Sequence, residues 1–125
     1  MHRAWYTVSE QIRIYGEEVY AVKEMELMNR IRLDLSQRGF AVFRANVGKV
    51  RTPDGRFFDT GLPKGFSDLF AIKDGRIFFI EVKVKPRKPT KEQLDFLKAM
   101  KDCYSCDGGV AYSVEEARDI CGLRS

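Results

Sequence analysis

The sequence contains no run that approaches the roughly 20 consecutive apolar residues of a membrane-spanning helix. Its N-terminus, MHRAWYTVSEQ, also lacks the apolar segment of a secretory signal. We therefore expect a cytoplasmic protein. Of the 125 residues, 44% are hydrophobic and 32% are charged, which allows one core under a solvated surface and fits a single domain.

Cysteine is scarce: the chain has three, at positions 103, 106 and 121. An odd number without an export signal argues against a disulfide framework. Cys103 and Cys106 form a C-x-x-C, but a structural zinc ion needs four nitrogen or sulfur ligands, and the other candidates are Cys121 and His2. We expect ordinary reduced thiols, with a zinc ion shared across a dimer and a redox dithiol as the alternatives.

Neither sign of charge dominates strongly. The net charge of +4 is compatible with a polyanionic partner but is common among soluble proteins. The distribution is more specific, because residues 83–91 hold five cations: Lys83, Lys85, Arg87, Lys88 and Lys91. This cluster is either a solvated connection or a surface for phosphate groups.

Hydrophobic periodicity predicts the order of elements. The spacing of Met28, Ile31 and Leu35 predicts a helix over residues 22–38 that ends at Gly39, and Gly16 is expected to interrupt any helix before it. Further predictions are strands at 40–44, 69–72, 76–84 and 109–112, two short strands within 47–59, and helices over 90–102 and from 113 onward. This order gives an α/β fold with a mixed sheet flanked by helices.

Turn and capping signals mark the boundaries of these elements. Pro53-Asp54-Gly55 predicts the turn between the two short strands. Thr90 with Gln93, and Ser113 with Glu116, have the spacing of capping boxes that open helices.

The hairpin around Asp74-Gly75 sets a register. These two residues favour a two-residue turn, which places Lys73 opposite Arg76 and, counting outward, Asp68 opposite Glu81. Side chains alternate along a strand, so Asp68 and Glu81 share one face of the sheet, and Lys83 lies on the same face.

Two carboxylates in such a pair need an explanation. Their Cβ atoms would lie about 5 Å apart, where like charges destabilise the strand pair unless a proton or a cation lies between them. Phe70 and Phe79 on the same face suggest partial desolvation, which strengthens that requirement. Mg²⁺ fits, because it prefers oxygen ligands and keeps several waters. The alternative is an exposed hairpin end where Asp68 and Glu81 point into water.

Two helical residues are expected to point toward this pair. Glu24 lies on the buried stripe of the first helix and Glu26 does not, although Glu24 is also explained by a helix end that reaches solvent. Gln93 lies on the inward stripe of its helix with Leu97 and Met100, although its capping box alone accounts for a glutamine there.

Asp68 followed by Glu81-Val82-Lys83 on the next strand resembles the PD-(D/E)XK nuclease signature. A longer string is similar to the VRR-NUC family, the virus-type replication-repair nucleases, in their compact stand-alone form. That string comprises Glu24, Asn46-Val47-Gly48, Gly65-Phe66-Ser67-Asp68-Leu69, Glu81-Val82-Lys83 and Gln93. The resemblance covers residues 22–114 and implies a nuclease domain over 21–125 after an N-terminal extension, residues 1–20, of uncertain structure. Ser67 replaces the proline of the signature, at a position that shapes the chain and carries no chemistry.

The resemblance implies a restriction-endonuclease-like core with the order α-β-β-β-α-β and a C-terminal helix. Asp68, Glu81 and the Val82 backbone carbonyl would bind Mg²⁺, for which Mn²⁺ would substitute. Lys83 would position or activate the attacking water, Glu24 would act through the water shell of the metal, and Gln93 would orient the site. Cleavage would leave a 5′-phosphate and a 3′-hydroxyl.

The chain is also similar to archaeal Holliday junction resolvases, whose first strand residues 39–44 resemble. That likeness implies a homodimer acting on branched DNA, and a viral, phage or bacterial source. The expected phosphate contacts are Lys49, Arg51, Arg56, Lys64, Lys85, Arg87 and Lys88. We expect a structure-selective DNA endonuclease of replication, recombination or repair. The alternatives are a restriction or general nuclease, and a non-catalytic DNA-binding or scaffold protein.

Overall fold

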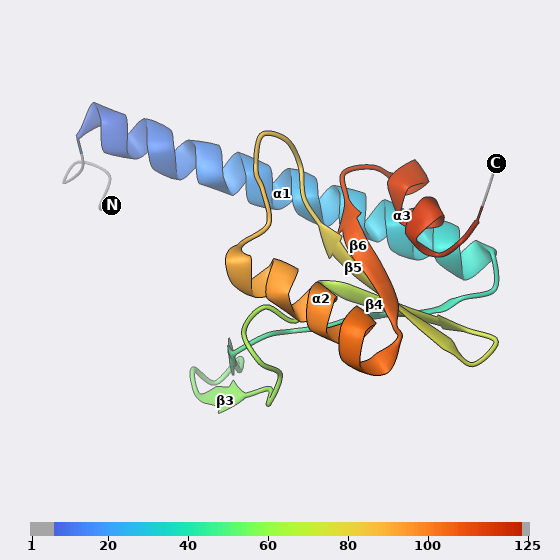
Figure 1. The fold of residues 1–125 in the computed structure, drawn as a ribbon. Coiled ribbons are helices and arrows are strands. Elements are labelled where there is room, and N and C mark those ends of the chain that lie inside the picture. Colours follow the sequence, from blue (N-terminus) through green and yellow to red (C-terminus); the bar gives the residue numbers. More distant parts are fainter. Residues whose placement is uncertain (1–6, 124–125) are drawn as a thin grey trace.

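The computed structural model describes residues 7–123, apart from the side chains of residues 11, 12, 49, 50 and 58 (Figure 1). Its helices are α1 (Val8–Gln37), α2 (Lys91–Tyr104) and α3 (Val114–Ile120). Its strands are β1 (Ala41–Arg44), β2 (Lys49–Arg51), β3 (Phe57–Asp59), β4 (Leu69–Lys73), β5 (Arg76–Val82) and β6 (Asp107–Ala111). None of the described helices is long and apolar enough to cross a membrane.

Four strands form a mixed sheet in the order β1-β4-β5-β6, in which only β6 runs parallel to its neighbour. Alternation along β5 sends Phe78 and Ile80 into the core with Ile31 of α1, whereas Phe79 packs against Phe96 of α2 at a centroid distance of 5.2 Å. Helices α1 and α3 therefore cover one face of the sheet and α2 the other (Figure 1). This is the mixed α/β fold that the sequence predicted.

The predicted register of the β4–β5 hairpin is confirmed. Lys73 pairs with Arg76 and Phe70 with Phe79. Asp74 and Gly75 have φ values of 52° and 75°, the positive pair that a tight hairpin turn requires.

Helix α1 is longer than predicted. Thr7 caps it: the Glu10 amide donates to Thr7 Oγ1 at 3.1 Å and the Thr7 amide donates to Glu10 Oε2 at 3.0 Å. The interruption expected at Gly16 is wrong, because the helix runs through it and one interior glycine costs only about 1 kcal/mol relative to alanine. The boundary expected between residues 20 and 21 thus falls inside one continuous helix (Figure 1).

The predicted capping boxes have different outcomes. The box of Thr90 and Gln93 is confirmed, and α2 continues two residues beyond the expected end. Ser113 caps α3 by accepting from the Glu116 amide at 3.1 Å, but the Glu116 carboxylate accepts from the Tyr112 amide instead of closing a box. That expected box is therefore only half formed.

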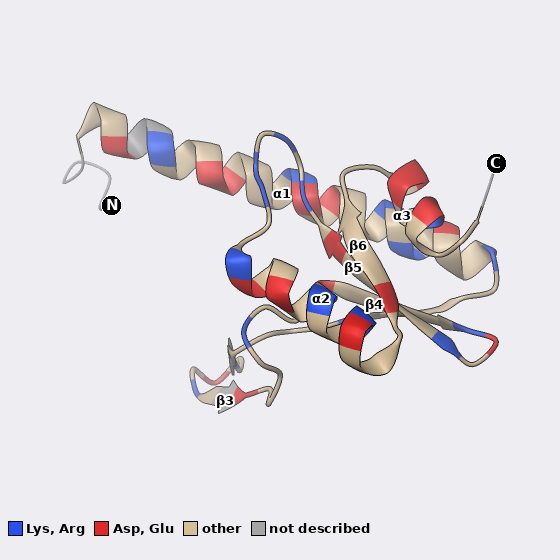
Figure 2. Ribbon diagram, in the orientation of Figure 1, with Lys and Arg blue, Asp and Glu red and all other residues tan. Residues whose placement is uncertain are grey.

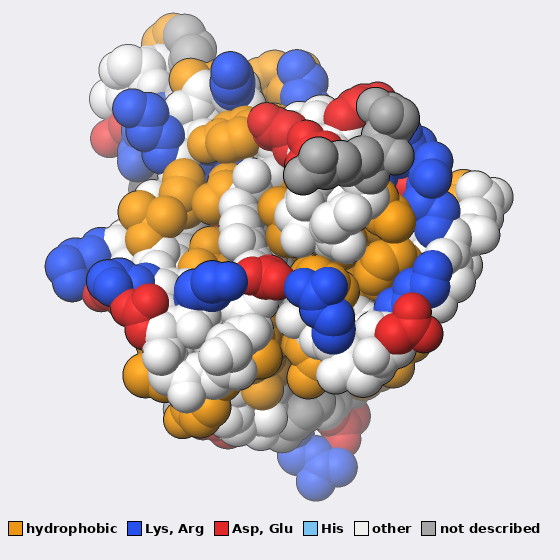
Figure 3. Space-filling view, turned by 45° about the vertical axis from the view of Figure 1, so that its right-hand side comes forward, with side chains coloured by type: hydrophobic (Ala, Val, Ile, Leu, Met, Phe, Trp, Pro, Cys, Tyr) orange, Lys and Arg blue, Asp and Glu red, His pale blue; other side chains and the backbone are white. Residues whose placement is uncertain are grey.

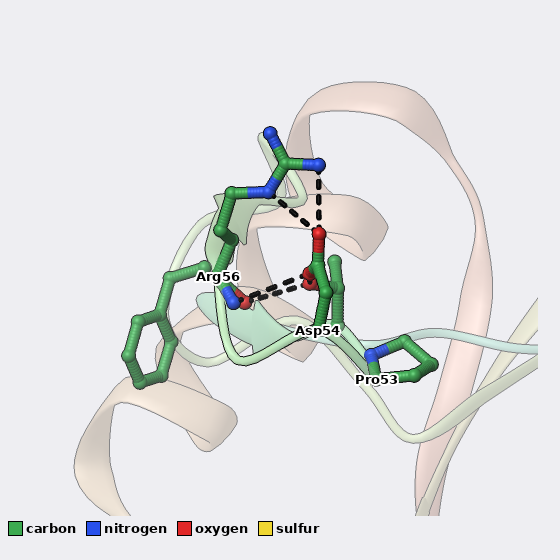
Figure 4. Close-up of a pocket in the computed structure, with 5 residues that line it drawn as sticks. Pro53, Asp54 and Arg56 are labelled. Atoms are coloured by element: carbon green, nitrogen blue, oxygen red, sulfur yellow. Dashed lines mark hydrogen bonds and ion pairs between the residues drawn. The ribbon is translucent and has the colours of Figure 1, made fainter.

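The two short strands form a hairpin of their own. β2 and β3 pair with each other in a separate two-stranded sheet, joined through the predicted turn. Asp54 pairs with Arg56 across the turn at 2.7 Å, beside a hollow of about 500 Å³ lined by Thr52, Pro53, Asp54, Arg56 and Phe57 (Figure 4).

Gly65 allows the loop before β4 to touch α2. Its φ is +93°, and a Cβ atom there would lie 2.5 Å from the Glu92 carbonyl oxygen. We expect Gly65→Ala to lower the free energy of unfolding by about 2–4 kcal/mol, from the backbone strain and the forced displacement together. Gly61→Ala is the matched control, because Gly61 has a φ of +80° but open space around it, so only the strain of about 1 kcal/mol applies. If urea denaturation showed the same loss of unfolding free energy in both variants, the close approach of Gly65 to the Glu92 carbonyl would be contradicted.

Candidate active site

Asp68 and Glu81 meet where β4 begins and β5 ends. Asp68 immediately precedes β4, and its Oδ2 accepts a hydrogen bond from the Val82 amide at 2.8 Å. Glu81 is only 1% exposed, and within the described part of the chain its Oε2 has no hydrogen-bond partner. The hairpin thus holds two carboxylates together and leaves one buried oxygen without a donor.

The charge of Glu81 is strongly disfavoured. Burial raises the pKa of Glu81 to about 9, and the neighbouring Asp68 carboxylate adds to the rise. Lys83 opposes the rise, and Glu24 adds to it. At neutral pH, Glu81 therefore keeps a proton unless a cation replaces it.

The residues present fit a divalent cation that retains its own waters. Glu81 Oε2 is an unsatisfied buried acceptor next to Asp68, and hard cations take carboxylate oxygens. Among the described residues, no group of three or more His, Cys, Asp or Glu side chains is arranged to hold a metal. Two carboxylates suit Mg²⁺ better than an ion that needs a full protein cage.

Gln93 contacts the carboxylate pair directly. Its Nε2 donates to Glu81 Oε1 at 2.9 Å, while its Oε1 accepts from the Thr90 amide at 2.8 Å. Gln93 therefore plays both roles considered from the sequence: it completes the capping box of α2 and it points into the site. Its amide is thereby fixed in orientation.

Glu24 is the glutamate of α1 that turns inward. Its side chain is 16% exposed and its Oε1 is buried, whereas Glu26 is exposed. Arg87 Nη1 lies 3.6 Å from Glu24 Oε1 and 3.9 Å from Glu17 Oε2. Glu24 contributes to the pKa of Glu81, so it lies close enough to act on the pair electrostatically.

Sequence reasoning missed how the loop after β5 is held. The Tyr112 hydroxyl donates to the Arg87 carbonyl at 3.0 Å, and Lys85 Nζ lies 5.8 Å from the centre of the Tyr112 ring. Tyr112 thus positions the segment that brings Arg87 to Glu24. Nothing in the spacing of the sequence connects residues 112 and 87, because the contact arises from the parallel pairing of β6 with β5.

Lys83 follows β5 and is buried, with 6% of its surface exposed. Its amide donates to the Ala111 carbonyl at 3.1 Å, which continues the β5–β6 pairing. The lysines of α2 form ion pairs with aspartates, whereas Lys83 forms no ion pair within residues 7–123. Its positive charge lowers the pKa of Glu81, so Lys83 acts on the carboxylate pair electrostatically.

The cations predicted to contact phosphate lie on separate segments. Arg51 lies over the Phe57 ring at 5.5 Å, Arg56 pairs with Asp54, and Lys64 is 3.7 Å from Glu92. Lys85 and Lys88 are exposed on the loop before α2, and the side chain of Lys49 is outside the described residues. Figure 2 shows this basic loop beside α1, and Figure 3 shows cationic and acidic side chains alternating on the visible face.

The cysteines do not gather at this site. Cys103, Cys106 and Cys121 are free, and Cys121 belongs to the hydrophobic core whereas Cys103 is exposed. Burial raises the pKa of the Cys121 thiol to about 11. Cys121 is therefore a core side chain held as a thiol.

Comparison with known proteins bears on the fold. No family model matches the sequence, and no curated protein matches it either. A solved structure described as a VRR_NUC domain is similar to this chain, with a TM-score of 0.57 and 20% identity over 82% of this chain and 98% of that one. The chain has the fold of a VRR_NUC domain. On this fold, the Asp68–Glu81 pair lies where β4 begins and β5 ends.

Proposed function

We propose that this protein is a metal-dependent, structure-selective DNA endonuclease that acts on branched DNA such as Holliday junctions or flaps. The observation that carries the proposal is buried Glu81, with its unpartnered Oε2, beside half-buried Asp68 and under the influence of the Lys83 charge. A pure DNA-binding protein gains nothing from burying a carboxyl group beside a second one, whereas a metal-dependent nuclease uses such a pair to bind the cation that assists phosphodiester hydrolysis. The VRR_NUC fold supports the same reaction class.

Asp68, Glu81 and the Val82 carbonyl would hold Mg²⁺, or Mn²⁺ in its place. A bound divalent cation supplies a Lewis acid for the phosphoryl oxygen and lowers the pKa of its water. Gln93 keeps Glu81 in one rotamer through its 2.9 Å hydrogen bond. The chain thus enters the reaction with its carboxylates already oriented.

Lys83 supplies the fixed positive charge. Lys83 is buried and its charge acts on Glu81, so its ammonium group would orient the attacking water and offset the extra negative charge of the pentavalent phosphorus. Glu24 would act from α1 through the water shell of the bound cation, and Arg87, whose Nη1 lies 3.6 Å from Glu24 Oε1, would hold that carboxylate in place. Arg87 is therefore a positioning residue as well as a candidate phosphate contact.

The exposed cations would hold the DNA backbone. Lys85 and Lys88 lie on the loop that leaves the site, and Arg51, Arg56 and Lys64 lie on the segments before β4. Such contacts give affinity and register without sequence specificity, which suits recognition of DNA shape. A homodimer would place one site on each strand of a branched junction.

Cleavage of a labelled panel tests this function. Four-way junction, 5′ flap, single strand and linear duplex are each incubated with Mg²⁺, Mn²⁺ or EDTA, beside Glu81→Ala. We expect metal-dependent, paired nicks near the junction centre that leave 5′-phosphates, and none from the variant. Indiscriminate cutting would assign a general nuclease instead, and no cutting of any substrate would assign a DNA-binding scaffold.

A further inference from the structure

Helix α1 carries apolar residues on two different faces. Leu27, Met28, Ile31 and Leu35 face the core. Val8, Tyr15 and Val22 of the N-terminal half are 73%, 64% and 57% exposed. At about 100° per residue, the centre of this exposed set lies about 175° around the helix from the core set. The N-terminal half therefore has an apolar face that the rest of the described chain does not cover.

The exposed face has the spacing of a coiled coil. In the sequence, apolar residues recur at positions 8, 12, 15, 19 and 22, in alternating steps of four and three. This is the spacing of the a and d positions of a heptad repeat, with 8, 15 and 22 at d and 12 and 19 at a. We call Val8, Tyr15, Val19 and Val22 the α1 seam.

The surface of the seam is already shaped to receive side chains. A hollow of about 380 Å³ is lined by Tyr15, Glu18, Val19, Val22, Lys23 and Glu26. In a coiled coil, each a or d side chain inserts between four residues of the facing helix. The spacing i, i+3, i+4, i+7 divides this lining into two such holes, 15-18-19-22 and 19-22-23-26, which would receive an a and a d side chain. The lining therefore matches two successive layers of a helix pair.

The charges that flank the α1 seam favour a second copy of this chain as the partner, with the two helices parallel. Glu18 lies at a g position and Lys23 at the following e position, and both are exposed. In a parallel pair, Glu18 of each chain lies beside Lys23 of the other, which makes two opposite-charge contacts. In an antiparallel pair centred between Tyr15 and Val19, Glu18 meets Glu18 of the other chain. Glu26 occupies the next a position, where facing carboxylates would repel, and so ends the seam after Val22.

The body of the protein leaves the seam accessible. Glu17 and Glu24, which face Arg87 on the loop after β5, lie at f positions, opposite the seam. Figure 1 shows the N-terminal half of α1 extending past the sheet. The contacts of the candidate active site are therefore made on the far side of the helix.

We propose that the N-terminal half of α1 is a self-association surface that pairs with a second copy of this chain as a parallel two-stranded coiled coil. This pairing involves only residues of α1 and does not depend on whether the protein is a nuclease. It supplies a surface for the homodimer that the proposed function calls for.

Sedimentation equilibrium of the full chain over a range of concentrations up to about 1 mM tests the surface. The expected mass rises from 14.4 kDa toward twice that value. Tyr15→Asp is expected to raise the dissociation constant about a hundredfold, because it places a charge in the seam. Tyr104→Asp is the matched control, since Tyr104 is 68% exposed on α2, and it should leave association unchanged. A mass of 14.4 kDa throughout, or a dimer insensitive to Tyr15→Asp, would overturn the proposal.

Charge reversal tests the direction of the pair. Glu18→Lys and Lys23→Glu are each expected to weaken association about tenfold, and the double variant to restore it. Restoration follows only if residues 18 and 23 of different chains are neighbours. Failure of the double variant to recover would exclude the parallel register. Because association is measured without DNA, these outcomes are independent of whether the protein cleaves.

Discussion

Asp68→Asn and Glu81→Gln are each expected to lower the rate of DNA cleavage by at least about 10³-fold while DNA binding persists. Both changes keep the shape of the side chain and remove one carboxylate charge from the cation site. Gln at position 81 can still accept from Gln93 and can donate to Asp68, so the fold is preserved. Removing a negative charge near phosphate should strengthen DNA binding if it changes it at all.

Single-turnover cleavage and fluorescence anisotropy on the same junction measure the two effects. Asp95→Asn is the matched control, because Asp95 is exposed on α2 and pairs with Lys91 away from the site. It should cleave as the parent does. Cleavage within tenfold of the parent in either active-site variant would show that the pair is not the catalytic centre.

The metal-free protein is expected to lose stability as the pH rises from about 5 to about 9. Below pH 4.5 the Glu81 carboxyl is protonated in both the folded and the unfolded states. Above that value the unfolded chain releases the proton, while the folded chain keeps it until the pH passes about 9. The free energy of unfolding therefore falls across this window. Asp34 and Asp107 have lowered pKa values, so the stability that they contribute is lost only on acidification. They therefore do not affect the change expected between pH 5 and pH 9.

Thermal unfolding in EDTA and in Mg²⁺ between pH 5 and pH 9 measures this competition. The affinity for Mg²⁺ should rise about tenfold per pH unit below pH 9, because binding must displace the proton. Glu81→Gln should remove the pH slope and, above about pH 5, stabilise the metal-free protein by about 1–3 kcal/mol, since the neutral amide does not have to take up a proton on folding as the Glu81 carboxylate does. If the stability of Glu81→Gln still fell with rising pH, a group other than Glu81 would be the cause.

The hairpin and its carboxylates were predictable because the information is local. Asp74-Gly75 fixes the turn, and alternation along two strands then brings Asp68 and Glu81 to one face. Gln93 was predictable in position for the same reason, since Thr90 fixes where α2 begins.

Other features were hidden because they depend on contacts between distant segments. The Arg87–Glu24 ion pair joins the loop after β5 to α1, and the Tyr112 hydrogen bond joins that loop to β6. The extension of α1 through Gly16 was missed for another reason. Its apolar residues change face along the helix, so no single stripe spans it.

The turn of the β4–β5 hairpin lies at the opposite end of both strands from the carboxylate pair. Five paired positions separate Asp74 and Gly75 from Asp68 and Glu81, and both turn residues are exposed. Residues inserted at that turn would lengthen a solvent-facing tip and leave the paired positions in register. The tip is therefore an attachment point for a fluorophore or a surface tether that keeps the labelling chemistry away from Asp68 and Glu81.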